Sequence, residues 1–422
     1  MSEGKGGERA RSHTAVSTGW QTKPLGDLCD FQRGLTYSKG DEVESSGNIV
    51  LRATNIDLAT NRLDFSELKY ISDSVAVPDS KKVRRGSLII CTASGSKSHL
   101  GKVAFIDDDY GYAFGGFMGM ITTKAELLPK FLFHLMTSDA YKHFIGALSD
   151  GANINNLKFD DLKQFSVPLP SLPEQRRIVG ILDEALAGIA TAKANAEKNL
   201  QNARALFESH LQAVFTQRGP EWVEKPLESV AGIMNGYAFK STDFSPKAGA
   251  RCIKITNVGV REFVSEADNY LPSDFGVKYA TVTVAKGSIV LALTRTIISG
   301  GLKVAVVPEE YDQALLNQRV AAIAPIPRLM VEPFLFAYLS TQVVVDYVKQ
   351  RVNTLMQPNL SIADLRGMPV PAPPVHEQTR IADQLCGLRV ETQRLASLYQ
   401  RKLAALDELK KSLLHQAFSG DL

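Results

Sequence analysis

The sequence Pro168-Leu-Pro-Ser-Leu-Pro-Glu-Gln-Arg-Arg-Ile-Val-Gly-Ile-Leu182 is followed, 203 residues later, by Pro371-Ala-Pro-Pro-Val-His-Glu-Gln-Thr-Arg-Ile-Ala-Asp-Gln-Leu385. Both stretches pass from a proline-rich step into a Glu-Gln pair and then into apolar residues three and four positions apart. This pattern predicts the start of an amphipathic helix. The carboxylates of Glu174 and Glu377 would lie in the first turn, where they interact favourably with the helix dipole. The chain therefore contains the same structural junction twice.

The junction belongs to a longer internal repeat. Trp20 has its counterpart in Trp222, an offset of 202, and Gly86 has its counterpart in Gly287, an offset of 201. From Phe131 to the C-terminus the offset stays at 203. A period near 200 residues greatly exceeds the roughly 20–50 residues of solenoid repeats, so each copy is expected to be a domain with its own core.

Each copy begins with a mixed pattern. Short β-branched runs bounded by Gly, Asp and Asn predict strands. These runs are residues 49–51, 87–90 and 103–106 in the first copy and 252–255, 288–292 and 304–307 in the second. Helical spacing follows at residues 128–145 and 333–352. Each domain is therefore predicted to be α+β.

Each proline-rich step is followed by a long stretch of uninterrupted helical spacing. No proline interrupts the apolar spacing from 173 to about 215 or from 376 to about 418, which predicts two helices, each roughly 64 Å long at 1.5 Å per residue. A narrow apolar stripe needs a partner helix, and the alanines of the first stripe suit the leucines of the second. We expect an antiparallel pair, although each helix could instead cover only its own domain. The residues expected to pair the helices are Ile178, Leu182, Ile189, Ala203, Ile381, Leu385, Leu395 and Leu406.

The predicted fold class is α+β: two tandem pseudo-symmetric domains separated by an antiparallel pair of long coiled-coil helices. The expected segments are a flexible tail (1–19), a first domain (20–170), a first spacer helix (171–219), a second domain (220–373) and a second spacer helix (374–422).

Composition limits the class of protein. The chain has 422 residues, 44% of them hydrophobic, and a formal net charge of only +3, so any nucleic-acid contact should be local or shared with a partner. The four cysteines lack Cys-x-x-Cys spacing, so buried reduced thiols are expected in place of a metal site. Charged residues interrupt the apolar stretches at 279–294 and 331–348, so no membrane span and a cytoplasmic location are expected.

This architecture resembles the specificity (S) subunit of type I restriction-modification systems, and the resemblance covers nearly all of residues 20–422. It rests on the two proline-rich steps in register, with Glu174-Gln175, Ile178 and Leu182 repeated as Glu377-Gln378, Ile381 and Leu385. The resemblance implies that residues 20–170 and 220–373 are target-recognition domains. Each would recognise one half of a bipartite site on double-stranded DNA, with the helices setting the spacing.

The resemblance also implies that this chain assembles with partner subunits into a complex for host defence. Two modification subunits would supply S-adenosylmethionine-dependent N6-adenine methylation, and two restriction subunits would supply ATP- and Mg²⁺-dependent translocation and cleavage. No cofactor and no catalytic or metal-binding residue is expected in this chain. The segment from Gly95 to Lys102 is not a phosphate-binding loop, because it has five residues between its glycines and is followed by Val103.

Two alternatives remain open. One is a specificity subunit of another restriction type, whose methyltransferase and nuclease share one chain. The other is a two-module scaffold that binds protein or glycan and has no affinity for DNA.

DNA-binding candidates were sought where donor side chains fall on loops at matched positions of both copies. The first place is a turn in which Gly34 and Gly236 are expected to permit φ > 0, with the alternative that it is a structural turn with its aromatic residue in the core. Its candidates are Arg33, Tyr37 and Lys39, and in the second copy Tyr237 and Lys240. The second is a strand-to-loop step with Arg52 or Lys254, in which Asn55 and Asn257 could instead cap the following turn.

The third place is the loop that differs most between the copies. Its candidates are Ser94, Ser96, Lys97 and His99 against Thr294, Arg295 and Thr296, with the alternative of a merely solvated loop. The fourth is Asn317, Gln318 and Arg319 against Gly115-Gly116-Phe117. Arg319 could pair with a guanine, and Asn317 and Gln318 could equally satisfy buried backbone groups.

Overall fold

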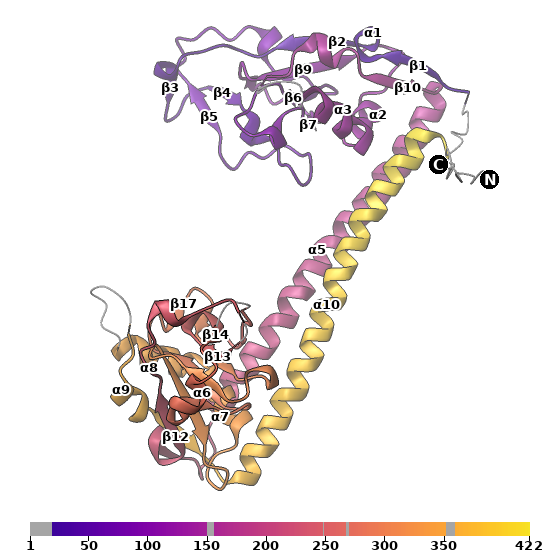
Figure 1. The fold of residues 1–422 in the computed structure, drawn as a ribbon. Coiled ribbons are helices and arrows are strands. Elements are labelled where there is room, and N and C mark those ends of the chain that lie inside the picture. The colour runs from indigo at the N-terminus through magenta and orange to yellow at the C-terminus, as the bar shows by residue number, and fades with distance from the viewer. Residues whose placement is uncertain (1–18, 150–155, 248, 267–269, 352–358) are drawn as a thin grey trace, which may run out of the picture. The chain divides into compact units, whose positions relative to one another are not determined.

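The computed structural model describes residues 19–149, 156–247, 249–266, 270–351 and 359–422. The chain divides into two compact units, residues 1–197 with 401–422 and residues 198–400 (Figure 1). The two long helices are thus shared between the units. The predicted tail lies, apart from Gly19, outside the described residues.

The first unit is built on two four-stranded sheets. One sheet is antiparallel, in the order β2 (Cys29–Arg33), β9 (Met118–Thr123), β6 (Leu88–Cys91) and β7 (Val103–Phe105). The other has the order β3 (Glu42–Val43), β5 (Lys69–Ile71), β4 (Asn48–Leu51) and β8 (Ala113–Phe114), with β4 parallel to β8.

Strand β6 explains why the predicted strands are uninterrupted apolar runs. Leu88 and Ile90 belong to a core shared with the helices, whereas Ile89 and Cys91 belong to a core shared with the second sheet. Successive side chains of a strand point to opposite faces, so a strand covered on both faces is apolar throughout. The predicted strands of both copies are confirmed, to within one or two residues at their ends.

The second unit repeats this construction. Its antiparallel sheet has the order β12 (Ala231–Asn235), β21 (Val320–Pro325), β16 (Ile289–Ala292) and β19 (Val304–Val306). Its mixed sheet has the order β14 (Tyr270–Leu271), β13 (Ala250–Ile253), β20 (Ala314–Leu316) and β15 (Thr283–Val284). It adds a short hairpin of β17 (Ile297–Ile298) and β18 (Gly301–Leu302). Each unit also has short helices. They are α1 (Leu25–Leu28) and α4 (Phe159–Leu162) in the first unit, and α6 (Phe275–Lys278) and α9 (Ile362–Arg366) in the second.

Helical structure is confirmed in the stretches predicted at 128–145 and 333–352, but each stretch is broken into two helices. The observed helices are α2 (Pro129–Leu135) and α3 (Asp139–Ser149), and α7 (Glu332–Leu339) and α8 (Gln342–Arg351). Hydroxyl side chains cause the break by taking helix-end carbonyls: Thr137 Oγ1 donates to the His134 carbonyl at 2.8 Å, and Thr341 Oγ1 donates to the Tyr338 carbonyl at 2.7 Å. Such local side-chain bonds compete with continuation of a helix.

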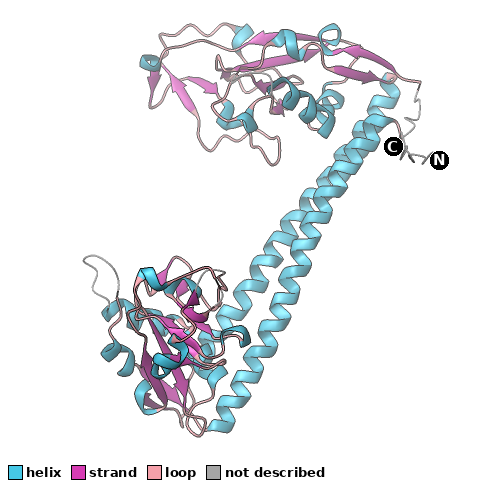
Figure 2. Cartoon of the chain, in the orientation of Figure 1, coloured by secondary structure: helices cyan, strands magenta, loops and turns pink. Residues whose placement is uncertain are grey.

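The two long helices are α5 (Leu172–Thr216) and α10 (Val375–Ser419), each 45 residues long (Figure 2). In the first unit, Lys193 Nζ lies 2.6 Å from Asp407 Oδ1, and Arg177 Nη2 donates to the Leu422 carbonyl at 2.6 Å. The partner numbers rise as the α5 numbers fall, so these segments are antiparallel, as predicted.

The predicted helix-pairing residues are buried or half-buried. Ile178 and Leu182 share one core cluster with Leu414 of α10 and with the first domain, so this segment packs against both. In the second unit, Ile381 and Leu385 likewise join the domain core. The remaining residues predicted to pair are buried (Ile189, Ala203) or half-buried (Leu395, Leu406).

The glutamine of each Glu-Gln pair fixes the start of a long helix. Gln175 is fully buried; its Oε1 accepts from the Leu128 N–H at 2.8 Å, and its Nε2 donates to the carbonyls of Glu126 and Pro170, both at 2.9 Å. Gln378 makes the same three bonds, to the Val331 N–H and to the carbonyls of Leu329 and Pro373. Each glutamine thereby ties the helix start to the segment that begins α2 or α7.

A two-stranded ribbon closes the base of each domain. Strand β1 (Gln21–Pro24) pairs antiparallel with β10 (Ser166–Leu169), and β11 (Val223–Pro226) pairs with β22 (Pro369–Ala372). The first and last strands of each domain are therefore neighbours.

Candidate nucleic-acid interface

The candidate segments of the first unit meet at one end of the β2-β9-β6-β7 sheet. Arg33, the last residue of β2, is paired with Gly119, and Cys91, the last residue of β6, is paired with Met118. The turn after β2, the loop after β6 and the turn before β9 therefore emerge together. The backbone N–H of Gly115 donates to the Leu51 carbonyl at 2.9 Å, which brings the Arg52 step to the same place.

The second unit assembles its counterparts in the same way. Asn235 ends β12 opposite Ala321, and Ala292 ends β16 opposite Val320. The Asn317 N–H donates to the Ile253 carbonyl at 3.0 Å and so joins the Lys254 step to the group. The sequence suggested four separate segments in each copy, and the fold gathers each set at one sheet end.

Glycine in the first candidate turn has a different role from the one predicted. Neither Gly34 nor Gly236 has a positive φ. A Cβ on Gly34 would overlap the carbonyl of Gly115, and a Cβ on Gly236 would overlap the carbonyl of Asn317. These glycines therefore allow two backbone segments to pack closely.

The side chains of this turn divide between core and surface. Tyr37 is half-buried against a small core cluster, and burial raises its pKa, so it is mainly structural. Arg33 and Lys39 are exposed, with the Arg33 guanidinium 5.3 Å from the centre of the Phe159 ring. In the second unit Tyr237 is 46% exposed and Lys240 is exposed, whereas the adjacent Phe239 is buried.

The second candidate step does not continue as a strand. Residues Ala53–Asn55 and Ile255–Asn257 form single 3₁₀ turns, which follow closely on the strands. Asn55 is buried; it accepts from the Arg52 N–H at 2.8 Å and donates to two carbonyls, which is the capping alternative. Arg52 is half-buried, and Lys254 lies 3.9 Å from Glu266 and over the Phe244 ring.

The third candidate loop is anchored by a buried lysine. Lys102 Nζ donates to the Ile56 carbonyl at 2.7 Å and to His99 Nδ1 at 2.9 Å. Burial lowers the pKa of both groups, and Lys102 lowers that of His99 further, so His99 is held neutral as an acceptor. Ser96 is exposed and its Oγ lies 2.8 Å from Ser98 Oγ; Ser94 is half-buried, and the side chain of Lys97 lies outside the described residues.

The counterpart loop corrects one candidate. Thr296 is fully buried, so it cannot contact DNA in this conformation. Thr294 is half-buried, and Arg295 is exposed on a backbone with φ of 49°. Lys303, which is half-buried, takes the place of Lys102 here and donates to the Ile255 carbonyl at 2.6 Å.

The fourth candidate segment is a tight turn over residues 317–320. The Val320 N–H donates to the Asn317 carbonyl at 2.9 Å, and the Gln318 N–H donates to the Tyr237 carbonyl at 3.0 Å. Asn317 is half-buried and its side chain faces the Arg319 N–H at 3.4 Å, which fits a structural role. The side chains of Gln318 and Arg319 are exposed.

Phe117 was not among the candidates, although it lies at the same sheet end. Its side chain is 73% exposed, against 46% for Tyr237 and 36% for Phe65. The sequence offered one signal, its alignment with Arg319. Its side chain carries no hydrogen-bond donor, so it does not fit the pattern of donor side chains.

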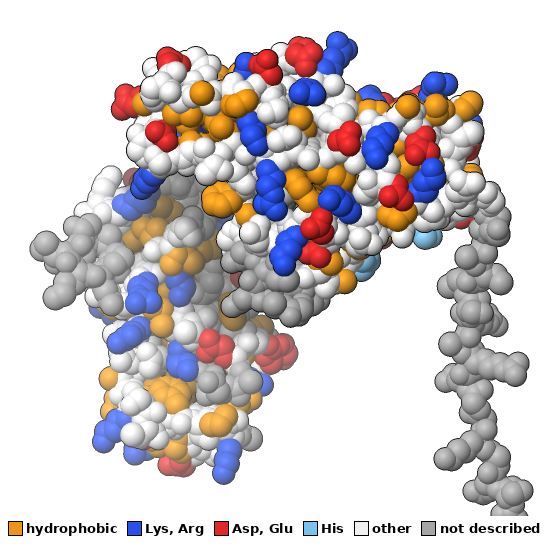
Figure 3. All heavy atoms as spheres, turned by 90° about the horizontal axis from the view of Figure 1, so that it is seen from above, with side chains coloured by type: hydrophobic (Ala, Val, Ile, Leu, Met, Phe, Trp, Pro, Cys, Tyr) orange, Lys and Arg blue, Asp and Glu red, His pale blue; other side chains and the backbone are white. Residues whose placement is uncertain are grey.

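Charge is spread evenly over the visible surface. Figure 3 shows Lys and Arg side chains interspersed with Asp, Glu and hydrophobic side chains on one face of the molecule.

The described residues contain no group of three or more His, Cys, Asp or Glu placed to hold a metal ion. Within the same described ranges, no helix combines the length and apolar character needed to cross a membrane. Cys29, Cys91 and Cys252 are buried, whereas Cys386 is exposed, contrary to the expectation of buried thiols throughout.

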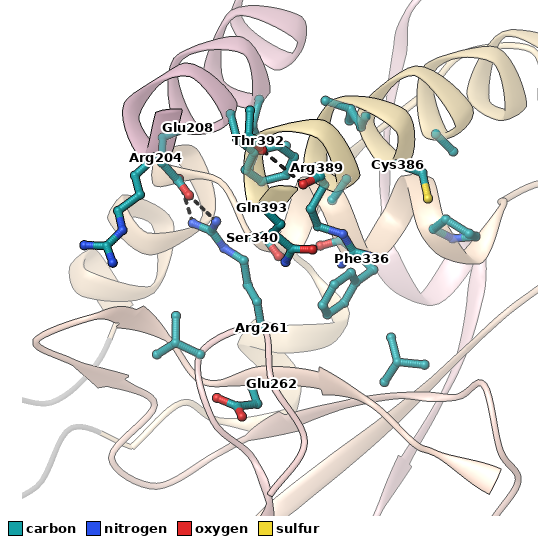
Figure 4. Close-up of a pocket in the computed structure, with 18 of the residues that line it drawn as sticks. Arg204, Glu208, Arg261, Glu262, Phe336, Ser340, Cys386, Arg389, Thr392 and Gln393 are labelled. Atoms are coloured by element: carbon teal, nitrogen blue, oxygen red, sulfur yellow. Dashed lines mark hydrogen bonds and ion pairs between the residues drawn. The ribbon is translucent and has the colours of Figure 1, made fainter. Parts of the chain in front are cut away.

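The second unit also contains a groove beside the long helices, with a volume of about 1130 Å³. Residues of α5, α10, α7 and the loop around Arg261 line it (Figure 4). Arg261 forms a two-pronged ion pair with Glu208 on its wall. Cys386 and Arg389 of α10 also line it, so the groove has both apolar and charged surface.

Comparison with known proteins assigns this architecture. The family described as "Type I restriction modification DNA specificity domain" matches residues 17–201 and 220–396. The chain belongs to this family. Both repeats are matched, and each match takes in one recognition domain and much of the long helix that follows it. The chain is thus a type I specificity subunit with two recognition domains.

Curated relatives match this specificity subunit over different shares of its length. The EcoKI specificity subunit of Escherichia coli (strain K12) is 26% identical, over 96% of this chain and 89% of that protein. The StySPI specificity subunit of Salmonella potsdam is 32% identical, but over only 43% of this chain and 39% of that relative.

Solved structures share the fold. A chain from work on complex assembly and conformational transition of the type I R-M system has a TM-score of 0.74 at 19% identity, covering 96% of this chain and 98% of that one. The HsdS subunit from Thermoanaerobacter tengcongensis has a TM-score of 0.62 at 19% identity, covering 96% and 97%.

Proposed function

We propose that this specificity subunit recognises a bipartite sequence on double-stranded DNA, one half-site with each domain, and performs no chemistry itself. The observation that carries the proposal is the matched sheet end in the two units. The backbone frame is similar, with a lysine that donates to a backbone carbonyl in each (buried Lys102 and half-buried Lys303), whereas the exposed side chains differ. Different side chains on one frame suit the recognition of two different half-sites.

The long helices are proposed to carry the partners. Exposed apolar side chains on these helices, together with the groove lined by Arg389, offer a docking surface for two modification subunits. Two restriction subunits would complete the complex. S-adenosylmethionine, ATP and Mg²⁺ are proposed to bind to those partners and not to this chain. The exposed apolar residues are Ile181 and Leu206 of α5 and Val390, Leu398 and Leu409 of α10.

The test is a gel shift of the subunit co-expressed with its modification subunit, on a pool of random-sequence DNA, followed by sequencing of adenine methylation in host DNA. We expect retention of a bipartite motif and methylation at the same motif. Arg295→Ala, which removes an exposed guanidinium at the sheet end, should weaken binding by about 1–3 kcal/mol if it contacts a base edge. A motif without a gap, or no retention of DNA, would contradict the proposal.

A further inference from the structure

Each recognition domain presents an exposed side chain at the third position of an equivalent turn. In the first unit residues 115–118 form a turn closed by the Met118 N–H, which donates to the Gly115 carbonyl at 2.8 Å. In the second unit residues 317–320 form the same turn. The third position of the turn is Phe117 in one unit and Arg319 in the other.

The backbone at this position is held from the neighbouring strand. The Phe117 carbonyl accepts from the Thr92 N–H at 2.9 Å and from the Ala93 N–H at 3.1 Å, and the Arg319 carbonyl accepts from the Leu293 N–H at 2.8 Å. The turn also packs against the close-fitting Gly34 or Gly236. The tip is therefore rigid at its base, which suits a residue that must meet a ligand in one geometry.

The side chains at the tip project away from the core. Phe117 is 73% exposed and Arg319 is exposed, and no ion pair of Arg319 is found within the described ranges. A phenyl ring in water gains nothing for the isolated domain, whereas on contact it buries a large apolar area with few rotatable bonds. Both positions lie among the donor side chains of the proposed interface.

We infer that Phe117 and Arg319 are equivalent specificity-determining residues that recognise different bases. An apolar side chain in the major groove contacts the thymine methyl group, and an arginine pairs with the O6 and N7 acceptors of guanine. Phe117 thus selects an A·T pair in the half-site of the first domain, and Arg319 selects a G·C pair in the half-site of the second. The inference rests on the proposed bipartite recognition of DNA.

The experiment compares methylation motifs of the assembled modification complex in a host that lacks other adenine methylation. Phe117→Ala should relax one A·T position in a single half-site, and Arg319→Ala should relax one G·C position in the other. The expected loss of discrimination is roughly 5- to 150-fold, the equivalent of about 1–3 kcal/mol for one good base contact. Arg319→Lys keeps the positive charge but loses the guanidinium group that can donate two hydrogen bonds to one guanine. It should therefore also relax the base preference at that position.

Matched controls separate recognition from folding and from general affinity. Leu58→Ala removes another exposed apolar side chain of the first unit, and Arg328→Ala removes an exposed arginine beyond the far end of β21. Both should leave the motif unchanged. A wild-type complex with a bipartite motif that Phe117→Ala and Arg319→Ala leave intact would overturn the inference alone. A wild-type complex without such a motif would instead overturn the proposed function.

Discussion

Replacing Gln175 with alanine should selectively destabilise the first unit. The change removes two partly buried hydrogen bonds, to Leu128 and Glu126, worth about 1 kcal/mol each, and leaves the buried Pro170 carbonyl without its donor, at about 1–3 kcal/mol. The total is about 3–5 kcal/mol. With a urea dependence near 2 kcal/mol per M, the unfolding midpoint should fall by roughly 1.5–2.5 M.

The two tryptophans allow the assay to follow each unit separately. Trp20 packs on the core of the first unit and Trp222 on that of the second, and the sequence contains no other tryptophan. In a Trp222→Phe background, Trp20 fluorescence during urea unfolding reports the first unit. Gln175→Ala should shift this transition, whereas Arg176→Ala, which changes an exposed neighbour, should not. A Gln175→Ala transition at the parent midpoint would refute the assigned role of the glutamine.

Three further predictions use the same measurement. Gly34→Ala forces a Cβ onto the Gly115 carbonyl and should cost about 1–3 kcal/mol together with loss of sequence preference; unchanged stability and motif would argue against the close packing. Burial, the main influence, lowers the pKa of His134 below its usual 6.5 despite Asp183. Below pH 6.5 the unfolded chain therefore binds a proton that the folded chain does not, so the stability present above pH 6.5 is lost as the pH falls. His134→Gln removes this titrating group and should flatten the decline of stability with falling pH. An unaltered pH slope would contradict this role of His134. Leu395→Asp, at a half-buried position of α10, should lower the stability of the second unit by about 2–5 kcal/mol, as measured by Trp222 fluorescence. Leu398→Asp, at a position that is 48% exposed, should leave that stability unchanged. Equal effects of the two changes would place Leu395 outside the helix pair.

The features that could be predicted from the sequence are those that local periodicity determines. The long helices, expected from 173 and 376, begin at Leu172 and Val375, because proline-rich steps and uninterrupted apolar spacing determine helix ends locally. The strands were predictable for the same reason. The break between α2 and α3 was missed, because the Thr137 hydroxyl competes for a helix-end carbonyl without disturbing the apolar spacing.

Long-range contacts were beyond the sequence. Gln175 is a motif residue whose partner Leu128 lies 47 positions away, so its three bonds could not be inferred. The convergence of the candidate loops depends on strand order, which the runs of apolar residues do not specify. Thr296 is polar and lies beside exposed Arg295, yet it is fully buried. Phe117 carries no donor, and nothing in the sequence alone shows that its ring is exposed.

The ribbons β1–β10 and β11–β22 make each recognition domain tolerant of insertions. Because the chain enters and leaves through adjacent strands, about 5 Å apart, a change in length between them is absorbed within the domain and does not move the helix that follows. The repeat already contains one such change: six residues separate the bridged pair Ile56 and Leu63, and four separate Val258 and Phe263. Each domain can thus be lengthened or rebuilt while the start of the long helix that follows it stays in place.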